Sequence, residues 1–168
     1  MTHPDLDAPQ TKSIVKALKE IDPQLAFLAL LTCQGIKPLS RWEKPADDQI
    51  LKLLPQLELL TGVVLRSVKI GKIITETIFS RTPGYIQLYQ SRWDHAPIDK
   101  SPPVQRFEGF LFGFPPCCVD EFIRHPYRPN RIDPQDQKIL FHWACNNCQI
   151  TPLLLPAYRR LNAYLADL

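Results

Sequence analysis

Seventeen prolines are spread along this chain of 168 residues. Each proline fixes φ and removes a backbone N–H, so prolines end or kink helices and interrupt strands. The sequence therefore predicts many short elements rather than long regular helices. Because 45% of the residues are apolar, a chain of this length can bury one continuous core, and we expect a single domain over residues 1–168.

The first part of the chain, residues 1–60, is predicted to be helical. Ile14, Leu18 and Ile21 form an apolar stripe at helical spacing. Asp22 is placed to cap a second helix, which the left-handed preference of a glycine would end near residue 35.

Residues 61–91 differ from this pattern and predict an antiparallel sheet. Residues 61–70 and 72–80 are rich in Val, Ile and Thr, and Gly71 between them suits a tight connection of two strands. Residues 85–90 alternate between apolar and polar side chains, which favours a third strand. The predicted fold class is α+β, with helices packed on a three-stranded antiparallel meander.

Residues 104–168 are predicted to form a helical C-terminal part that carries the cysteine motifs. The pair Pro115-Pro116 is expected to start a short helix, and Pro134 to start a second that extends towards Trp143. Pro156 is expected to open a last helix. The boundaries of these helices thus follow the prolines.

Four of the five cysteines lie in this C-terminal part, in the segments Pro-Cys117-Cys118 and His142-x-x-Cys145-x-x-Cys148. A Cys-x-x-Cys pair is a common half-site for tetrahedral Zn²⁺ or an iron–sulfur cluster, because its turn directs both sulfurs to one point. The first turn of a helix favours thiolate over thiol at the vicinal pair, and the thiolate is the form that binds metals.

Three arrangements of these residues compete, and a set of reduced, buried cysteines is the fourth possibility. In the first, Zn²⁺ takes Cys145, Cys148, one of the vicinal pair and His142, which would share a helix face with Cys145. Vicinal helical side chains diverge by about 100°, so both are expected to reach a single ion only rarely. In the second, all four cysteines hold an iron–sulfur cluster, and in the third the thiols form a redox pair.

The sequence predicts a metal-binding protein with a Zn²⁺ or iron–sulfur site, and no catalytic residue is assigned. If the metal is structural, the protein is a binding module or scaffold. If the thiols are redox active, it is a thiol/disulfide redox protein or an electron-transfer enzyme. Whether the protein is an enzyme therefore stays open at this point.

The words Gly-Phe-Pro-Pro-Cys-Cys-Val and His-x-x-Cys-x-x-Cys resemble those of an uncharacterised prokaryotic family, domain of unknown function 483. The resemblance covers roughly residues 108–155. It implies that Cys117, Cys118, His142, Cys145 and Cys148 belong to one motif, and it implies no activity.

The charge pattern excludes few partners. A formal charge of +3 does not by itself predict binding to nucleic acid, and the basic loop with Arg124, Arg128 and Arg131 is more typical of a solvated mixed-charge segment. Nucleic-acid binding is thus not expected, although this loop leaves it open. The sequence has neither an apolar run of membrane-spanning length nor a secretory signal pattern, so we expect a cytoplasmic protein with no membrane contact.

Overall fold

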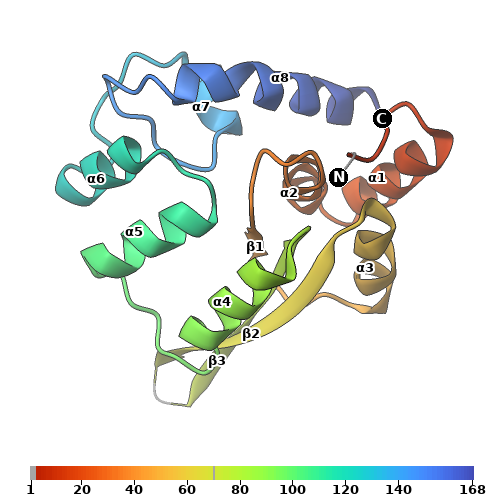
Figure 1. The fold of residues 1–168 in the computed structure, drawn as a ribbon, viewed down its shortest axis with the longest axis horizontal. Helices are drawn as coiled ribbons and strands as arrows, with labels where there is room; N and C mark the ends of the chain where they lie inside the picture. The colour runs from red at the N-terminus through yellow and green to blue at the C-terminus, as the bar shows by residue number, and fades with distance from the viewer. Residues whose placement is uncertain (1–2, 70) are drawn as a thin grey trace.

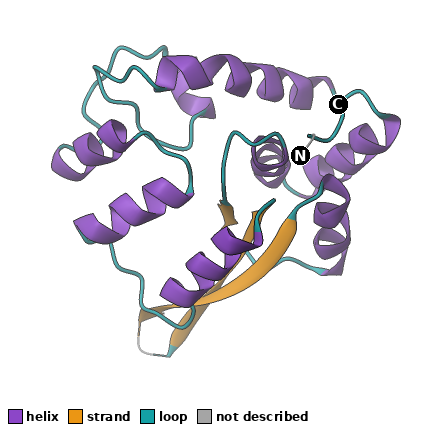
Figure 2. Ribbon diagram, viewed as in Figure 1, coloured by secondary structure: helices purple, strands orange, loops and turns teal. Residues whose placement is uncertain are grey.

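The computed structural model describes residues 3–69 and 71–168, which form eight α-helices and one three-stranded antiparallel sheet that lies along the lower edge of the view in Figure 1. The α+β fold class is therefore confirmed, and Figure 2 shows the helices distributed around the sheet and above it. None of the helices in the described part of the chain has the length and apolar character needed to cross a bilayer.

The elements follow one another in the order helix, helix, strand, helix, two strands and five helices. The helices are α1 (Pro9–Ile21), α2 (Pro23–Cys33), α3 (Asp48–Leu53), α4 (Pro83–Trp93), α5 (Pro102–Leu111), α6 (Pro116–Arg124), α7 (Pro134–Ile139) and α8 (Thr151–Asp167), with a 3-10 turn η1 (Leu54–Leu57) after α3. The strands are β1 (Ser40–Trp42), β2 (Leu60–Lys69) and β3 (Lys72–Ser80).

Helix α2 lies at the centre of the molecule (Figure 1). Every residue from Leu25 to Cys33 is buried, so this helix is apolar on all sides and must be covered on all sides. The covering elements are α1, α8, β1 and β3. Phe27 of α2 packs edge-on against Tyr158 of α8, with ring centroids 6.1 Å apart.

Asp22 caps α2 as the sequence predicts and also joins that helix to the sheet. Its side chain accepts hydrogen bonds from the backbone N–H groups of Gln24 and Leu25. Its second oxygen accepts from the Trp42 indole N–H at 3.2 Å and pairs with Lys44 at 2.9 Å. The cap therefore links the start of α2 to β1.

The sheet has the order β1-β3-β2, and the third strand is not where the sequence prediction placed it. Residues 85–90 belong to α4, and the edge strand is β1, which pairs with β3 through Ser40 opposite Phe79. The alternation that suggested a strand was misleading, because Ile86, Tyr89 and Trp93 are the buried residues of α4 and recur at helical spacing.

The hairpin between β2 and β3 agrees with the prediction. Lys69 pairs with Lys72, and Gly71 has a φ of 75°, which a glycine adopts without steric cost. Ile70, which the prediction included in the first strand, lies outside the described residues.

The two faces of the sheet contribute to two separate cores. Phe79 of β3 belongs to the core around α2, whereas its neighbour Ile78 belongs to a second core with α4 and α5. Successive strand residues point to opposite faces, which explains this division. Helix α4 approaches β2 closely at Gly62, where an added Cβ would lie 2.8 Å from Ile86.

A buried network of charged and polar groups connects the sheet to α5. Arg41 of β1 donates hydrogen bonds to Glu108 at 2.9 Å and to the Tyr89 hydroxyl at 3.1 Å. The Tyr89 hydroxyl donates to Glu76 at 2.8 Å, and Arg66 lies 3.8 Å from both Glu76 and Glu108. This network holds α5 against the sheet, beside the region that contains the cysteines.

Two predicted helix boundaries in the C-terminal part are wrong. Helix α8 begins at Thr151 rather than at Pro156, which lies inside it; the missing N–H removes one hydrogen bond, but buried side chains on both sides keep the helix continuous. Helix α7 ends at Ile139 and does not extend towards Trp143, because the Gln137 side chain bonds the loop that follows, at the His142 carbonyl and the Ala144 N–H.

We expect Asp22→Ala to lower the free energy of unfolding by about 1–2 kcal/mol at neutral pH, since it removes the cap of α2. Burial would raise the pKa of Asp22, but hydrogen bonds from Lys44, Gln24 and Trp42 outweigh burial and lower it from 3.8. This stabilisation is therefore complete above pH 3.8 and is lost as the pH falls through the lower pKa of the folded protein. Urea unfolding across this pH range measures both effects.

The control for this prediction is Glu20→Ala on the exposed side of α1, which should change the unfolding free energy little. Equal effects of the two substitutions at neutral pH would contradict the capping role of Asp22.

Candidate metal centre

Helix α6 positions the first two cysteines. Pro116 occupies the first turn, and Cys117 and Cys118 follow it directly, as the sequence predicts. Gly113, just before this helix, has a φ of 71° and packs against Pro38, where a Cβ would lie 2.8 Å from the ring. The chain therefore reverses tightly before α6 and directs the start of the helix towards the loop that carries the other cysteines.

The loop between α7 and α8 positions Cys145 and Cys148. The N–H of Cys148 bonds the Cys145 carbonyl at 3.3 Å, which closes the turn between them. Asn130 holds the loop from behind, because its side chain donates to the Ala144 carbonyl at 2.8 Å and to Gln137 at 3.0 Å. Helix α8 begins three residues after the second cysteine.

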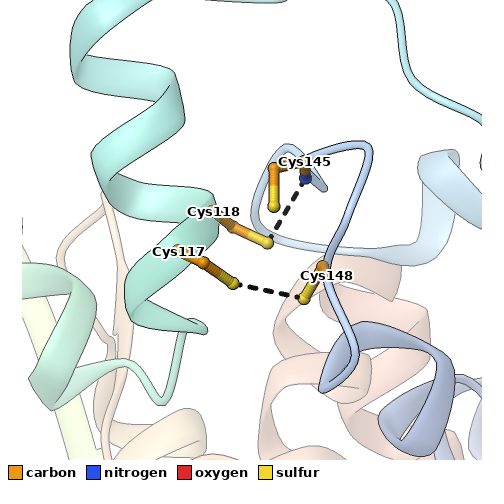
Figure 3. Close-up of side chains that lie close together, drawn as sticks. All are labelled: Cys117, Cys118, Cys145 and Cys148. Atoms are coloured by element: carbon orange, nitrogen blue, oxygen red, sulfur yellow. Dashed lines mark hydrogen bonds between the residues drawn. The ribbon is translucent and has the colours of Figure 1, made fainter.

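The structure brings the four sulfur atoms of Cys117, Cys118, Cys145 and Cys148 together, all within 4.8 Å of one another (Figure 3). The Sγ atoms of Cys117 and Cys148 are 3.5 Å apart. In a tetrahedral zinc site with Zn–S bonds of about 2.3 Å, neighbouring sulfurs stand about 3.8 Å apart. The four side chains could therefore bind a metal ion.

Both members of the vicinal pair belong to this group. The expectation that a single ion rarely binds two neighbouring helical cysteines stays a prediction. The loop lies beside the first turn of α6, so that Cys118 faces Cys145 and Cys117 faces Cys148 (Figure 3). The backbone N–H of Cys145 lies 3.4 Å from Cys118 Sγ, whereas Cys117 Sγ faces Cys148.

Thr151 places two hydrogen-bonding groups beside the sulfurs, its hydroxyl and its backbone N–H. The sequence analysis did not single it out. Its hydroxyl lies 3.2 Å from Cys148 Sγ and 3.6 Å from Cys118 Sγ, and its N–H donates to Cys148 Sγ at 3.2 Å. The spacing Cys-x-x-Cys-x-x-Thr could have identified Thr151, because a hydroxyl in the first turn of a helix can reach the side chain three residues before it. Such donors stabilise thiolate charge and orient metal ligands.

Thr151 lies between the ring of His142 and the sulfur of Cys148. The Nε2 atom of His142 is 2.9 Å from the Thr151 hydroxyl, and its other ring nitrogen, Nδ1, is buried without a hydrogen-bond partner among the described residues. His142 and Cys145 do not share a helix face, because the chain between α7 and α8 is not helical. The imidazole contacts Thr151, and the group of four ligand atoms consists of cysteines alone.

Burial and hydrogen bonding shift the pKa values of the thiols in different directions. Burial raises the pKa of Cys118, and burial together with neighbouring thiols raises that of Cys117 to about 11. Burial would also raise the pKa of Cys148, but donors from Thr151, Cys118 and Cys117 outweigh it and lower the pKa to about 7. Cys148 is therefore the first of the three to become a thiolate, and a bound cation would favour the loss of the remaining protons.

The fifth cysteine lies elsewhere. Cys33 is fully buried at the end of α2, and burial raises its pKa to about 12. A reduced cysteine in such a position packs as a small apolar group.

The basic loop after α6 is partly balanced by acidic side chains. Arg128 pairs with Glu121 at 3.0 Å, and Arg124 lies 3.9 Å from the same carboxylate. Arg131 follows in the loop before α7. Binding of nucleic acid by these arginines stays a prediction that the sequence analysis did not favour.

No family model, curated protein or solved structure matches this chain. The arguments for its function therefore depend on the geometry of its own residues.

We expect the His142 ring to stay neutral from about pH 8 down to about pH 5, because burial first, and the charge of Lys37 second, lower its pKa to about 4. The folded state then loses stability as the pH falls below about 6.5, where the unfolded histidine takes up a proton that the folded one does not. Ring chemical shifts in an NMR titration measure the protonation directly. A midpoint near 6.5 for His142 would contradict the desolvated position described above.

Proposed function

We propose that this protein binds one Zn²⁺ through Cys117, Cys118, Cys145 and Cys148, and that the ion is structural. The observation that supports this proposal is the convergence of four sulfurs within 4.8 Å. Four cysteines complete a tetrahedral shell and leave no position for substrate or water, which is typical of structural rather than catalytic zinc.

The region around the cysteines has a physical need for such an ion. Cys118 is the buried residue of α6, and α7 has none. Helices that bury so little apolar surface gain little stability from packing. A metal that joins the start of α6 to the loop before α8 would supply the missing stability, since structural zinc contributes about 10 kcal/mol or more in small zinc modules.

The sulfur spacing favours one ion over an iron–sulfur cluster. In a cluster, iron and sulfide stand between the thiolates and push the cysteine sulfurs apart, whereas a single ion draws them together. Four thiolates on Zn²⁺ would leave a net charge of −2, and the N–H groups of Cys145 and Thr151 are placed to stabilise it.

One observation supports a second candidate, a thiol/disulfide redox function. Cys117 is exposed, and its sulfur lies 3.5 Å from that of Cys148, whose pKa is lowered to about 7. A thiolate beside an accessible thiol is the arrangement that redox-active cysteine pairs use. Metal content separates this candidate from the zinc proposal.

The two cysteine motifs also support a further proposal, that residues 108–155 belong to the domain of unknown function 483 family. That assignment adds no activity to the one proposed here.

We expect the protein, purified without oxygen in the presence of a reductant, to contain about one zinc per chain and to show no visible absorption band. Cys145→Ser should lose most of the metal and several kcal/mol of unfolding free energy, because three thiolates hold zinc less tightly than four. Elemental analysis and thermal unfolding measure these changes.

Cys33→Ala is the matched control, since it also removes a thiol but lies outside the group of four. It should keep the full zinc content. About four irons with sulfide would instead support the cluster, and a metal-free protein with a reversible Cys117–Cys148 disulfide would support the redox candidate.

We expect Thr151→Val to weaken zinc binding by about tenfold or more, because it removes the hydroxyl that faces Cys148 and Cys118. Thr151→Ser should keep most of the affinity, because it retains the hydroxyl. Competition with a chromogenic chelator measures both variants, and equal losses in the two would assign the effect to packing of the methyl group rather than to the hydrogen bond.

A further inference from the structure

A cleft of about 740 Å³ lies beside the cysteine site, between the N-terminal part of the chain and the segments around α5 and α6. Lys37, Arg41 and Trp42 are among the residues that line it. Phe114, Phe141 and His142 line it as well. This volume is in the range of sites for small organic ligands, which combine aromatic walls with a few polar groups.

Lys37 is the most unusual of the lining residues. Its side chain is 3% exposed, and its ammonium group donates one hydrogen bond, to the Phe112 carbonyl at 2.9 Å. The Nζ atom lies 4.5 Å from the ring centroid of Phe114 and 5.4 Å from that of Phe141. Within residues 3–69 and 71–168 no carboxylate lies within ion-pair distance of this Nζ, so the ammonium group contacts a carbonyl and aromatic faces but has no anionic partner there.

The other cations of the cleft are already balanced by acidic side chains. Arg41 donates to Glu108 at 2.9 Å and to Glu43 at 3.0 Å. Lys44 pairs with Asp22 at 2.9 Å. Lys37 is therefore the lining cation, among the described residues, whose charge is left for a ligand.

His142 is a second polar residue that lines the same cleft. It is 8% exposed and has a buried Nδ1 atom without a hydrogen-bond partner among the residues described. Its ring lies 5.5 Å from that of Phe114, the same ring that carries Lys37 on its face. Buried polar groups without partners are rare in folded proteins, and each one calls for a ligand, a water or an ion.

We propose that this cleft binds a small organic anion, whose carboxylate or phosphate group pairs with Lys37 and whose flat apolar body lies against the aromatic walls. An ammonium buried without a counter-charge is costly, and an anion beside it would remove that cost. The aromatic rings supply apolar area for the rest of the ligand. Burial, with Arg41 nearby, lowers the pKa of Lys37 to about 7, which agrees with a cation that lacks an anionic partner.

The ligand site and the metal site meet at His142, whose Nε2 contacts Thr151, which in turn contacts Cys148. The proposal nevertheless does not depend on the identity of the metal, because Lys37 and its aromatic neighbours are not part of the cysteine group.

Titration of the full-length protein with benzoate and phenyl phosphate tests the proposal, with benzamide as the neutral probe. Trp42 and Trp143 line the cleft, so tryptophan fluorescence follows binding. We expect at least one of the two anions to bind and benzamide to bind about tenfold more weakly or not at all. The tighter anion identifies the preferred group, carboxylate or phosphate.

Lys37→Met should weaken binding of that anion by about tenfold or more, because it keeps the length of the side chain and removes its charge. Lys44→Met is the matched control: it removes a lysine from the same cleft that already pairs with Asp22, and it should leave the affinity nearly unchanged. Circular dichroism checks that both variants fold.

A readout on the unmodified protein does not require any variant to fold. Binding of the anion should shift the ring resonances of His142 and leave those of the exposed His125 in place. The proposal is overturned if neither anion binds at about 10 mM, a concentration that would reveal even weak sites. It is equally overturned if benzamide binds as tightly as the anions, or if Lys37→Met leaves the affinity unchanged.

Discussion

The burial of α2 is the constraint on which the rest of the structure depends. Its nine residues from Leu25 to Cys33 are buried, so no face of the helix can be left to solvent. Helices α1 and α8 and the strands β1 and β3 supply the cover. Two of these elements connect the core to the sites described above: the loop that carries Lys37 joins α2 to β1, and the loop that carries Cys148 leads into α8.

The cysteine site and the cleft are consequences of how the chain returns to that core. The segment from α5 to α7 leaves the sheet, contributes two cysteines from α6, and comes back to start α8 (Figure 1). Much of this excursion is held by polar side chains such as Asn130 and Gln137 and by the sulfur contacts rather than by a deep apolar core. The cleft forms where the excursion faces the loop of Lys37 without filling the space between them.

The sequence was informative where a local rule decides the structure. The cap at Asp22, the start of α6 at Pro116 and the hairpin at Gly71 each depend on a few adjacent residues, and the convergence of the two cysteine motifs could be inferred from the chemistry of thiols. The third strand could not be predicted, because Ser40–Trp42 is too short to show a periodicity and pairs with β3, far along the chain. Residues 85–90 fit both a strand pattern and a helix pattern. In the structure they are helical, and the absence of a side chain at Gly62 lets this helix approach β2 closely. The contact of Thr151 with Cys148 follows from a local spacing, whereas its contact with Cys118 joins residues distant in sequence. Lys37 likewise gains its importance from Phe114, a distant neighbour that no local pattern reveals.

The pairing of α2 with α8 also has a kinetic consequence. Phe27 of α2 packs against Tyr158 of α8, and Lys19 of the preceding helix α1 donates a hydrogen bond to the carbonyl of Leu165 in α8, 146 positions further along the chain. Contacts between such distant segments form late, because the entropy of closing a long loop must be overcome first. Until α8 docks, one side of α2 has no cover, so we expect self-association to compete with completion of the core during refolding.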